Sequence, residues 1–222
     1  LGIEPAKDIA QIANNKNIHT VNAYFNNNVT KKIIKKYGHV KLVTANNVLA
    51  NVDDLKNWVK NIKLLIGDKG FFIFESFSLR DVLKNKVVDF IYHEHMSYYT
   101  VNTFMKLGKM YSFYIEKVEE ISTHGGSIRV YLKHGQGYNS SINEYLINER
   151  NIKDDINDLF LKVNLWKDKL KQYYVKNMVG YGASGRTNTI LNYLDLNLDL
   201  IFDDSKYKIN SYLPYFHTPI KS

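Results

Sequence analysis

The chain has 222 residues, 45% of them hydrophobic, which is enough for one large domain or two small ones. It has no cysteine, so disulfides and thiolate metal sites are excluded within these residues, and it contains no apolar run of the about 18 residues that a transmembrane helix needs. The formal net charge of +8 comes mostly from lysines spread along the chain, which favours solvated helix faces over a nucleic-acid surface. We expect no nucleic-acid or membrane partner, and the lack of cysteine fits a cytoplasmic location.

Residues 1–5 (LGIEP) are typical of a strand end with Glu4 at its tip, and a helix follows with Ile9, Ile12 and Ala13 at helical spacing. In doubly wound folds, an acidic residue at the tip of the second strand holds the ribose hydroxyls of a nucleotide cofactor. The chain begins with Leu inside this strand, so we interpret it as a fragment of a longer protein.

Strands and helices then alternate up to residue 75. The predicted strands are 18–24, 40–45 and 71–74, and the predicted helices are 29–37 and 53–65. The last strand is wholly apolar, as expected for a strand covered on both faces of a parallel sheet. The alternation predicts an α/β sheet with right-handed crossovers, which binds ligands at the carboxyl ends of its strands. The polar residues at those ends are Glu4, Asn46, Asn47 and Glu75.

The stretch 91–99 (IYHEHMSYY) combines two imidazoles, a carboxylate and three phenols. Histidine has its ordinary pKa near neutrality, so it can act as an acid or a base. If the stretch is extended, Tyr92 and Glu94 point one way and His93 and His95 the other. We identify this stretch as a candidate active site.

The remaining elements suggest a second domain. A helix is predicted at 104–110 and strands at 113–118 and 127–133, with His124-Gly125-Gly126 as a tight turn between the strands. The loop 135–141 is the best candidate boundary. A long amphipathic helix is predicted to follow at 152–173, then a strand, a Gly-rich turn and a helix over 178–194, and a strand at 198–202. Such a turn can place a phosphate on a helix N-terminus.

Five segments together resemble one family. They are 2–5 (GIEP), 47–54 (NVLANVDD), 92–98 (YHEHMSY), 124–129 (HGGSIR) and 180–189 (GYGASGRTNT). The family is the sugar C-methyltransferases that use S-adenosylmethionine and act on nucleotide-linked keto-deoxysugars. The Tyr-His-Glu-His and His-Gly-Gly-Ser-x-Arg elements carry most of the specificity.

The resemblance implies two domains. Residues 1–135 would be a Rossmann-like class I methyltransferase sheet that lacks its first strand and Gly-rich loop, and residues 136–222 a smaller Rossmann-like C-terminal domain that does not hold the methyl donor. The family's Cys-rich zinc-binding region would precede this chain, so we expect zinc only there and no metal site here. The implied role is deoxysugar biosynthesis.

The resemblance also assigns site residues. His95 matches the proposed base, and Tyr92 and Glu94 match residues that line the same pocket. The cofactor would contact Glu4, Ala45, Asn46 and Asn47, and the sugar substrate would contact Asn51, His124 and Arg129. Asn51 stands where the family commonly has a His, and Asn cannot take a proton at neutral pH. Arg186 stands where a Lys is more usual.

Two alternatives remain. The missing Gly-rich loop and Asn51 favour a truncated, non-catalytic protein that binds nucleotide-sugars. A metal-dependent enzyme could use His93 and His95, but a stable site needs a third ligand, for which His124 is the nearby candidate. The coding region upstream of Leu1 would discriminate between the enzyme and the truncated protein.

Overall fold

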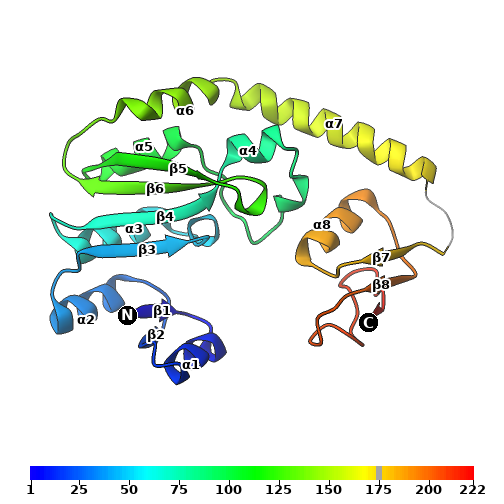
Figure 1. Cartoon of the computed structure of the whole chain (residues 1–222), viewed down its shortest axis with the longest axis horizontal. Helices are drawn as coiled ribbons and strands as arrows, with labels where there is room; N and C mark the ends of the chain where they lie inside the picture. Colours follow the sequence, from blue (N-terminus) through cyan, green and yellow to red (C-terminus); the bar gives the residue numbers. More distant parts are fainter. Residues whose placement is uncertain (174–176) are drawn as a thin grey trace. The chain divides into compact units, whose positions relative to one another are not determined.

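The structure is a computed structural model that describes residues 1–173 and 177–222 (Figure 1). Contacts divide it into two compact units. They are the N-terminal unit, Leu1–Ser78 with Met96–Glu149, and the C-terminal unit, Leu79–His95 with Arg150–Ser222. The chain therefore enters the C-terminal unit twice, and it returns to the N-terminal unit between His95 and Met96. The domain boundary expected near residue 135 stays a prediction.

The N-terminal unit begins with a small parallel sheet. Strand β1 (Gly2–Glu4) pairs with β2 (Thr20–Asn22), and α1 (Lys7–Asn15) connects them. Ala10 is buried, whereas Ile9 and Ile12 are exposed, because this narrow sheet covers only a strip of the helix. Helix α2 (Asn27–Tyr37) follows and ends at the predicted residue 37, and Gly38 after it has φ of 76°.

A four-stranded sheet, ordered β3-β4-β6-β5, forms the centre of the N-terminal unit. Its strands are β3 (Leu42–Asn46), β4 (Phe71–Phe77), β5 (Phe113–Ile121) and β6 (Ser127–His134). Strands β3 and β4 are parallel through the crossover helix α3 (Leu55–Ile66), whereas β6 is antiparallel to both of its neighbours. Within the described residues, no hydrogen-bonded ladder joins β1–β2 to β3, so the single predicted sheet is split. The parallel β–α–β arrangement agrees with the predicted α/β class.

The main core lies on one face of this sheet. Phe72 and Phe74 of β4 pack with Phe104 of α5 (Val101–Met110), and all three are almost fully buried. On the other face Phe71 and Ile73 are only half-buried, so this face is covered less than the apolar run predicts. The remaining short elements of the unit are η1 (Leu49–Asn51), η3 (Thr123–Gly125), η4 (Ser140–Ile142) and α6 (Asn143–Asn148).

The C-terminal unit combines a helical part with a parallel sheet. Helix α4 (Leu79–Lys84) and the one-turn η2 (Val88–Phe90) accompany the long helix α7 (Ile152–Tyr173). The predicted strand–turn–helix–strand follows as β7 (Val179–Tyr181), α8 (Gly185–Leu194) and β8 (Leu200–Phe202), and β9 (Ile220–Lys221) extends the sheet in the order β7-β8-β9. This arrangement agrees with a smaller Rossmann-like domain. Among the described helices, none is both long and apolar enough to cross a membrane.

Candidate active-site residues

Glu4 lies at the carboxyl end of β1, as predicted. The residue is half-buried, and its Oε1 accepts the backbone N–H of Ala6 at 2.8 Å in an exposed contact. The Glu4 carbonyl accepts the side-chain amide of Asn22, at the end of β2, at 3.0 Å. These contacts fix a negative charge at the turn between β1 and α1, where a carboxylate can accept hydroxyl groups.

The end of β3 supplies two exposed amides. Asn46 and Asn47 are both exposed, and Asn47 has φ of 54°, a left-handed conformation that Asn tolerates. The Asn47 N–H donates to the Glu75 carbonyl at 2.8 Å, which fixes the turn as the chain leaves the sheet. Ala45 is 7% exposed and packs in the core, so its side chain is not available to a ligand.

Asn51 is exposed at the end of η1. The segment that follows the tyrosine-histidine stretch is bound beside it, because the Met96 N–H donates to the Ala50 carbonyl at 2.9 Å. The Tyr99 hydroxyl donates to the Leu49 carbonyl at 3.1 Å. Within the N-terminal unit, residues 96–99 are therefore held against residues 49–51.

Arg129 is engaged by acidic side chains of its own sheet. Its guanidinium donates to Glu75 Oε2 from Nε at 3.2 Å and from Nη2 at 2.9 Å, and Nη1 lies 3.6 Å from Glu119 Oε2. The hydrogen bond to Glu75 raises the pKa of Arg129. The residue is thus a fixed cation with a 38% exposed side chain. The side chain of His124, the other candidate from this region, lies outside the described part of the structure.

The tyrosine-histidine stretch is not extended, so the condition for an alternation of its side chains is not met. The His95 N–H donates to the Tyr92 carbonyl at 3.0 Å, which closes a turn. The turn brings the rings of Tyr92 and His95 within 4.2 Å of each other, centroid to centroid. Both side chains are half-buried, whereas His93 and Glu94 are exposed. The stretch therefore separates Tyr92 and His95 from the two residues between them.

The contacts of His95 define its neutral tautomer. Its Nδ1 lies 2.9 Å from the carbonyl oxygen of Phe90, a residue only 5% exposed. A carbonyl can only accept, so in the neutral ring the hydrogen is on Nδ1 and the lone pair is on Nε2. Burial, followed by the charge of Glu94, raises the pKa of Tyr92, while Arg186 opposes the shift. The cluster thus combines a basic nitrogen with a phenol that stays protonated.

The candidate residues fall into two groups. Tyr92, Glu94 and His95 belong to the C-terminal unit. The candidates of the N-terminal unit are Glu4, Ala45, Asn46, Asn47, Asn51, His124 and Arg129. Among the described residues, no group of three or more His, Asp or Glu is arranged to hold a metal ion. The sequence analysis did not identify Asp89 and Phe90, which contact Arg186. The only hint in the sequence was the unusual Arg at position 186, where the family usually has a Lys.

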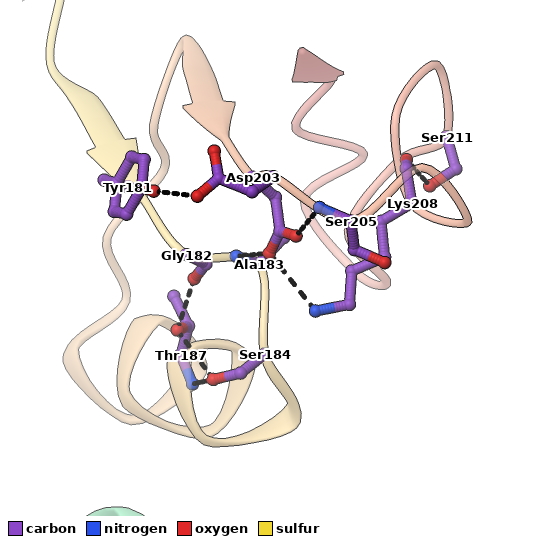
Figure 2. Close-up of polar contacts among 10 residues, drawn as sticks. Tyr181, Gly182, Ala183, Ser184, Thr187, Asp203, Ser205, Lys208 and Ser211 are labelled. Carbon is purple, nitrogen blue, oxygen red and sulfur yellow. Dashed lines mark hydrogen bonds and ion pairs between the residues drawn. The ribbon is translucent and has the colours of Figure 1, made fainter. Parts of the chain in front are cut away.

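A carboxylate of the C-terminal unit, that of Asp203, is hydrogen-bonded to the Gly-rich turn of the same unit (Figure 2). Asp203, which is 8% exposed at the end of β8, accepts the N–H groups of Ala183 at 2.7 Å and Ser205 at 2.8 Å. Lys208 Nζ adds a contact at 3.1 Å. Beside them, the Tyr181 hydroxyl donates to Asp204 at 2.5 Å. The buried N–H donor of the turn, that of Ala183, is therefore already hydrogen-bonded within the protein.

Comparison with known families agrees with this architecture. Residues 1–118 match the family described as a methyltransferase domain. The chain belongs to that methyltransferase family. Residues 122–222 match a second family, described as the C-methyltransferase C-terminal domain. The two matches follow each other along the chain and together cover nearly all of it.

A curated relative is similar over part of this chain. The C-methyltransferase NovU of Streptomyces niveus is 30% identical over 131 residues, which are 59% of this chain and 31% of NovU. The chain thus matches about a third of the length of this relative.

Solved structures resemble the fold only in part. A SAM-dependent methyltransferase from Anabaena variabilis has a TM-score of 0.46 at 12% identity, over 60% of this chain and 67% of that chain. A 1,6-didemethyltoxoflavin-N1-methyltransferase from Burkholderia thailandensis, solved with S-adenosylhomocysteine, has a TM-score of 0.41 at 12% identity, over 60% of each chain. These partial similarities do not assign a substrate or a site residue to this chain.

Proposed function

We propose that this methyltransferase transfers a methyl group from S-adenosylmethionine to a carbon next to the keto group of a nucleotide-linked deoxysugar. The tandem match to a methyltransferase domain and a C-methyltransferase C-terminal domain carries the proposal. The similarity to NovU, a C-methyltransferase, supports the C-methyl chemistry. The sugar class rests on the family resemblance of residues 92–98 and 124–129.

The strand ends of the N-terminal unit fit S-adenosylmethionine in their chemistry. The carboxylate of Glu4 suits ribose hydroxyls, which are donors, and the exposed amides of Asn46 and Asn47 can both donate and accept. In this proposal these three residues hold the cofactor, with the backbone of Ala45 beside them. Asn51 and Arg129 would contact the sugar nucleotide, as would His124.

His95 is the proposed base. A carbon beside a ketone loses a proton when a base is positioned on it and the resulting enolate is stabilised. The Nε2 lone pair, selected by the contact of Nδ1 with the Phe90 carbonyl, would take that proton. Tyr92, whose pKa burial raises further, is available to donate to a developing oxyanion, and Glu94 would line the pocket. When bound, S-adenosylmethionine supplies the electrophilic methyl group.

The test uses methyl transfer from radiolabelled S-adenosylmethionine to nucleotide-linked keto-deoxysugars. We expect His95→Gln to lower kcat by at least about 100-fold, the usual contribution of a positioned base. His93→Gln is the matched control, because His93 is exposed on the same turn, and it should keep most of the activity. Absence of transfer by the wild-type protein, or an unaffected His95→Gln variant, would contradict the proposal.

Exchange of the substrate's acidic hydrogen provides a second readout. In deuterated water without cofactor, the wild-type protein should exchange the hydrogen next to the keto group, and His95→Gln should not. Exchange requires the base but no methyl donor, so it separates a failed proton abstraction from failed cofactor binding.

A further inference from the structure

Arg186 contacts two consecutive residues at the start of the turn that carries His95. Its Nε donates to Asp89 Oδ2 at 2.6 Å, and its guanidinium carbon lies 4.8 Å from the centroid of the Phe90 ring. The side chain of Arg186 is 43% exposed and that of Asp89 is 24% exposed. A planar guanidinium can make an ion pair at its edge and stack through its face at the same time, which the ammonium of Lys cannot do.

Arg186 is itself held in place by the start of α8. It is the second residue of the helix, and Ser184 caps the helix by accepting the N–H of Thr187 at 3.1 Å. The Thr187 hydroxyl donates to the Gly182 carbonyl at 2.6 Å, which ties the helix start to the Gly-rich turn. The backbone that carries the guanidinium is therefore fixed by hydrogen bonds on both sides.

The contacts continue from Phe90 to the imidazole. The Phe90 ring lies 5.3 Å from the His95 ring, and the Phe90 carbonyl accepts the Nδ1–H at 2.9 Å. A hydrogen bond weakens steeply when its angle is lost, so the orientation of this carbonyl decides how strongly one tautomer is preferred. Asp89 and Phe90 are the residues of η2 that Arg186 holds, and they set that orientation.

We propose that Arg186 is a positioning residue for His95: by holding Asp89 and Phe90 it keeps the Phe90 carbonyl on Nδ1–H and the lone pair on Nε2. This assigns a role to the departure from the family's usual Lys. The proposal rests on the proposed function in one respect, the use of the Nε2 lone pair as a base. The tautomer itself can be measured without substrate or cofactor.

The decisive experiment is ¹⁵N NMR of the histidine-labelled chain at about pH 8.5, where an ordinary histidine is neutral. The chain has seven histidines, and His95→Gln identifies the signals of His95. In the wild-type protein we expect Nδ1 to carry the hydrogen. In Arg186→Met and in Asp89→Asn, the signals should move towards the Nε2–H tautomer, and in Arg186→Lys the shift should be intermediate.

Arg150→Met is the matched control, because Arg150 is an exposed arginine of the same unit and should leave the signals unchanged. Should Arg186→Met fail to fold by circular dichroism, Asp89→Asn and Arg186→Lys decide the question. An Nε2–H tautomer in the wild-type protein, or unchanged signals in the folded Arg186 and Asp89 variants, would overturn the proposal.

Kinetics then connect the tautomer to turnover. We expect Arg186→Met to lower kcat for methyl transfer by about tenfold and to change KM by less than about twofold, because misorienting a base affects the transition state more than binding. Arg186→Lys should recover part of kcat. If the wild-type protein transfers no methyl group but the tautomer responds as expected, the proposed function fails and the positioning role stands.

Discussion

The acidic residue at a strand end has different hydrogen-bond partners and a different exposure in the two Rossmann-like regions. In the C-terminal unit, Asp203 is 8% exposed and accepts the N–H of Ala183 in the Gly-rich turn, with Lys208 beside it. In the N-terminal unit, Glu4 is half-buried and accepts the N–H of Ala6. The donor of the C-terminal turn is thus already used by a protein carboxylate, which would also repel a ligand phosphate.

This difference shows why a Gly-rich strand–turn–helix is not sufficient for a nucleotide site. The turn of residues 180–187 has the spacing and the helix that such a site needs. Whether the turn can bind an anion depends on a carboxylate about twenty residues later in the chain. Cofactor binding is therefore expected at the strand ends of the N-terminal unit, and variants of both units test that difference.

Among the variants that test this difference between the units, Glu4→Gln should have the largest effect. The change replaces a carboxylate by an amide of the same shape, so it weakens charge-assisted hydrogen bonds to ribose hydroxyls. We expect the affinity for S-adenosylmethionine, measured by calorimetry, to fall by about tenfold. Asp203→Asn is the matched change in the C-terminal unit and should alter the affinity by less than about twofold. Equal effects of the two variants would remove the distinction between the two strand ends.

Asn47 allows the amide and the backbone of the open strand end to be tested separately. Asn47→Gly removes the amide but accepts the φ of 54°, whereas Asn47→Ala also strains the backbone. We expect both variants to bind S-adenosylmethionine about threefold more weakly, the loss of one weak hydrogen bond. Only Asn47→Ala should lower the free energy of unfolding, by about 1 kcal/mol. Unchanged affinity in both variants would exclude the Asn47 amide from the site.

The sequence predicted the regular elements because their signals are local. The apolar run 71–74 and the predicted helices 53–65 and 29–37 correspond to β4, α3 and α2. Elements without such signals were missed. The short helix α4 and the two-residue strand β9 were not predicted, because neither spans enough residues to show a period.

The candidate site was predicted by residue type but not by arrangement. The stretch 91–99 was identified from its chemistry, yet its geometry depends on a turn closed by backbone atoms, which carries no side-chain pattern. The contact of Arg186 with Asp89 joins residues 97 positions apart, and no local period reports such a pair. Burial of Ala45 likewise depends on the core formed by distant helices.

The smallest expected effect is the acid sensitivity of the C-terminal turn. The N–H of Ser205 is the largest cause that lowers the pKa of Asp203, followed by the N–H of Ala183 and by Lys208, and burial opposes them. The folded-state pKa therefore lies below the ordinary value of about 3.9. The stability contributed by Asp203 is fully present above that value and is lost as the pH falls through the folded-state pKa.

Urea unfolding at pH values from about 7 down to about 3 checks this sign. Trp166 of α7, in a Trp58→Phe background, reports on the C-terminal unit, because the chain has two tryptophans and these lie in different units. We expect Asp203→Asn to unfold at a lower urea concentration at about pH 7, and the difference from the reference protein to shrink below about pH 4. Lys208→Met should lower the midpoint less. A difference that stays constant over the whole pH range would mean that the Asp203 charge does not hold the turn closed.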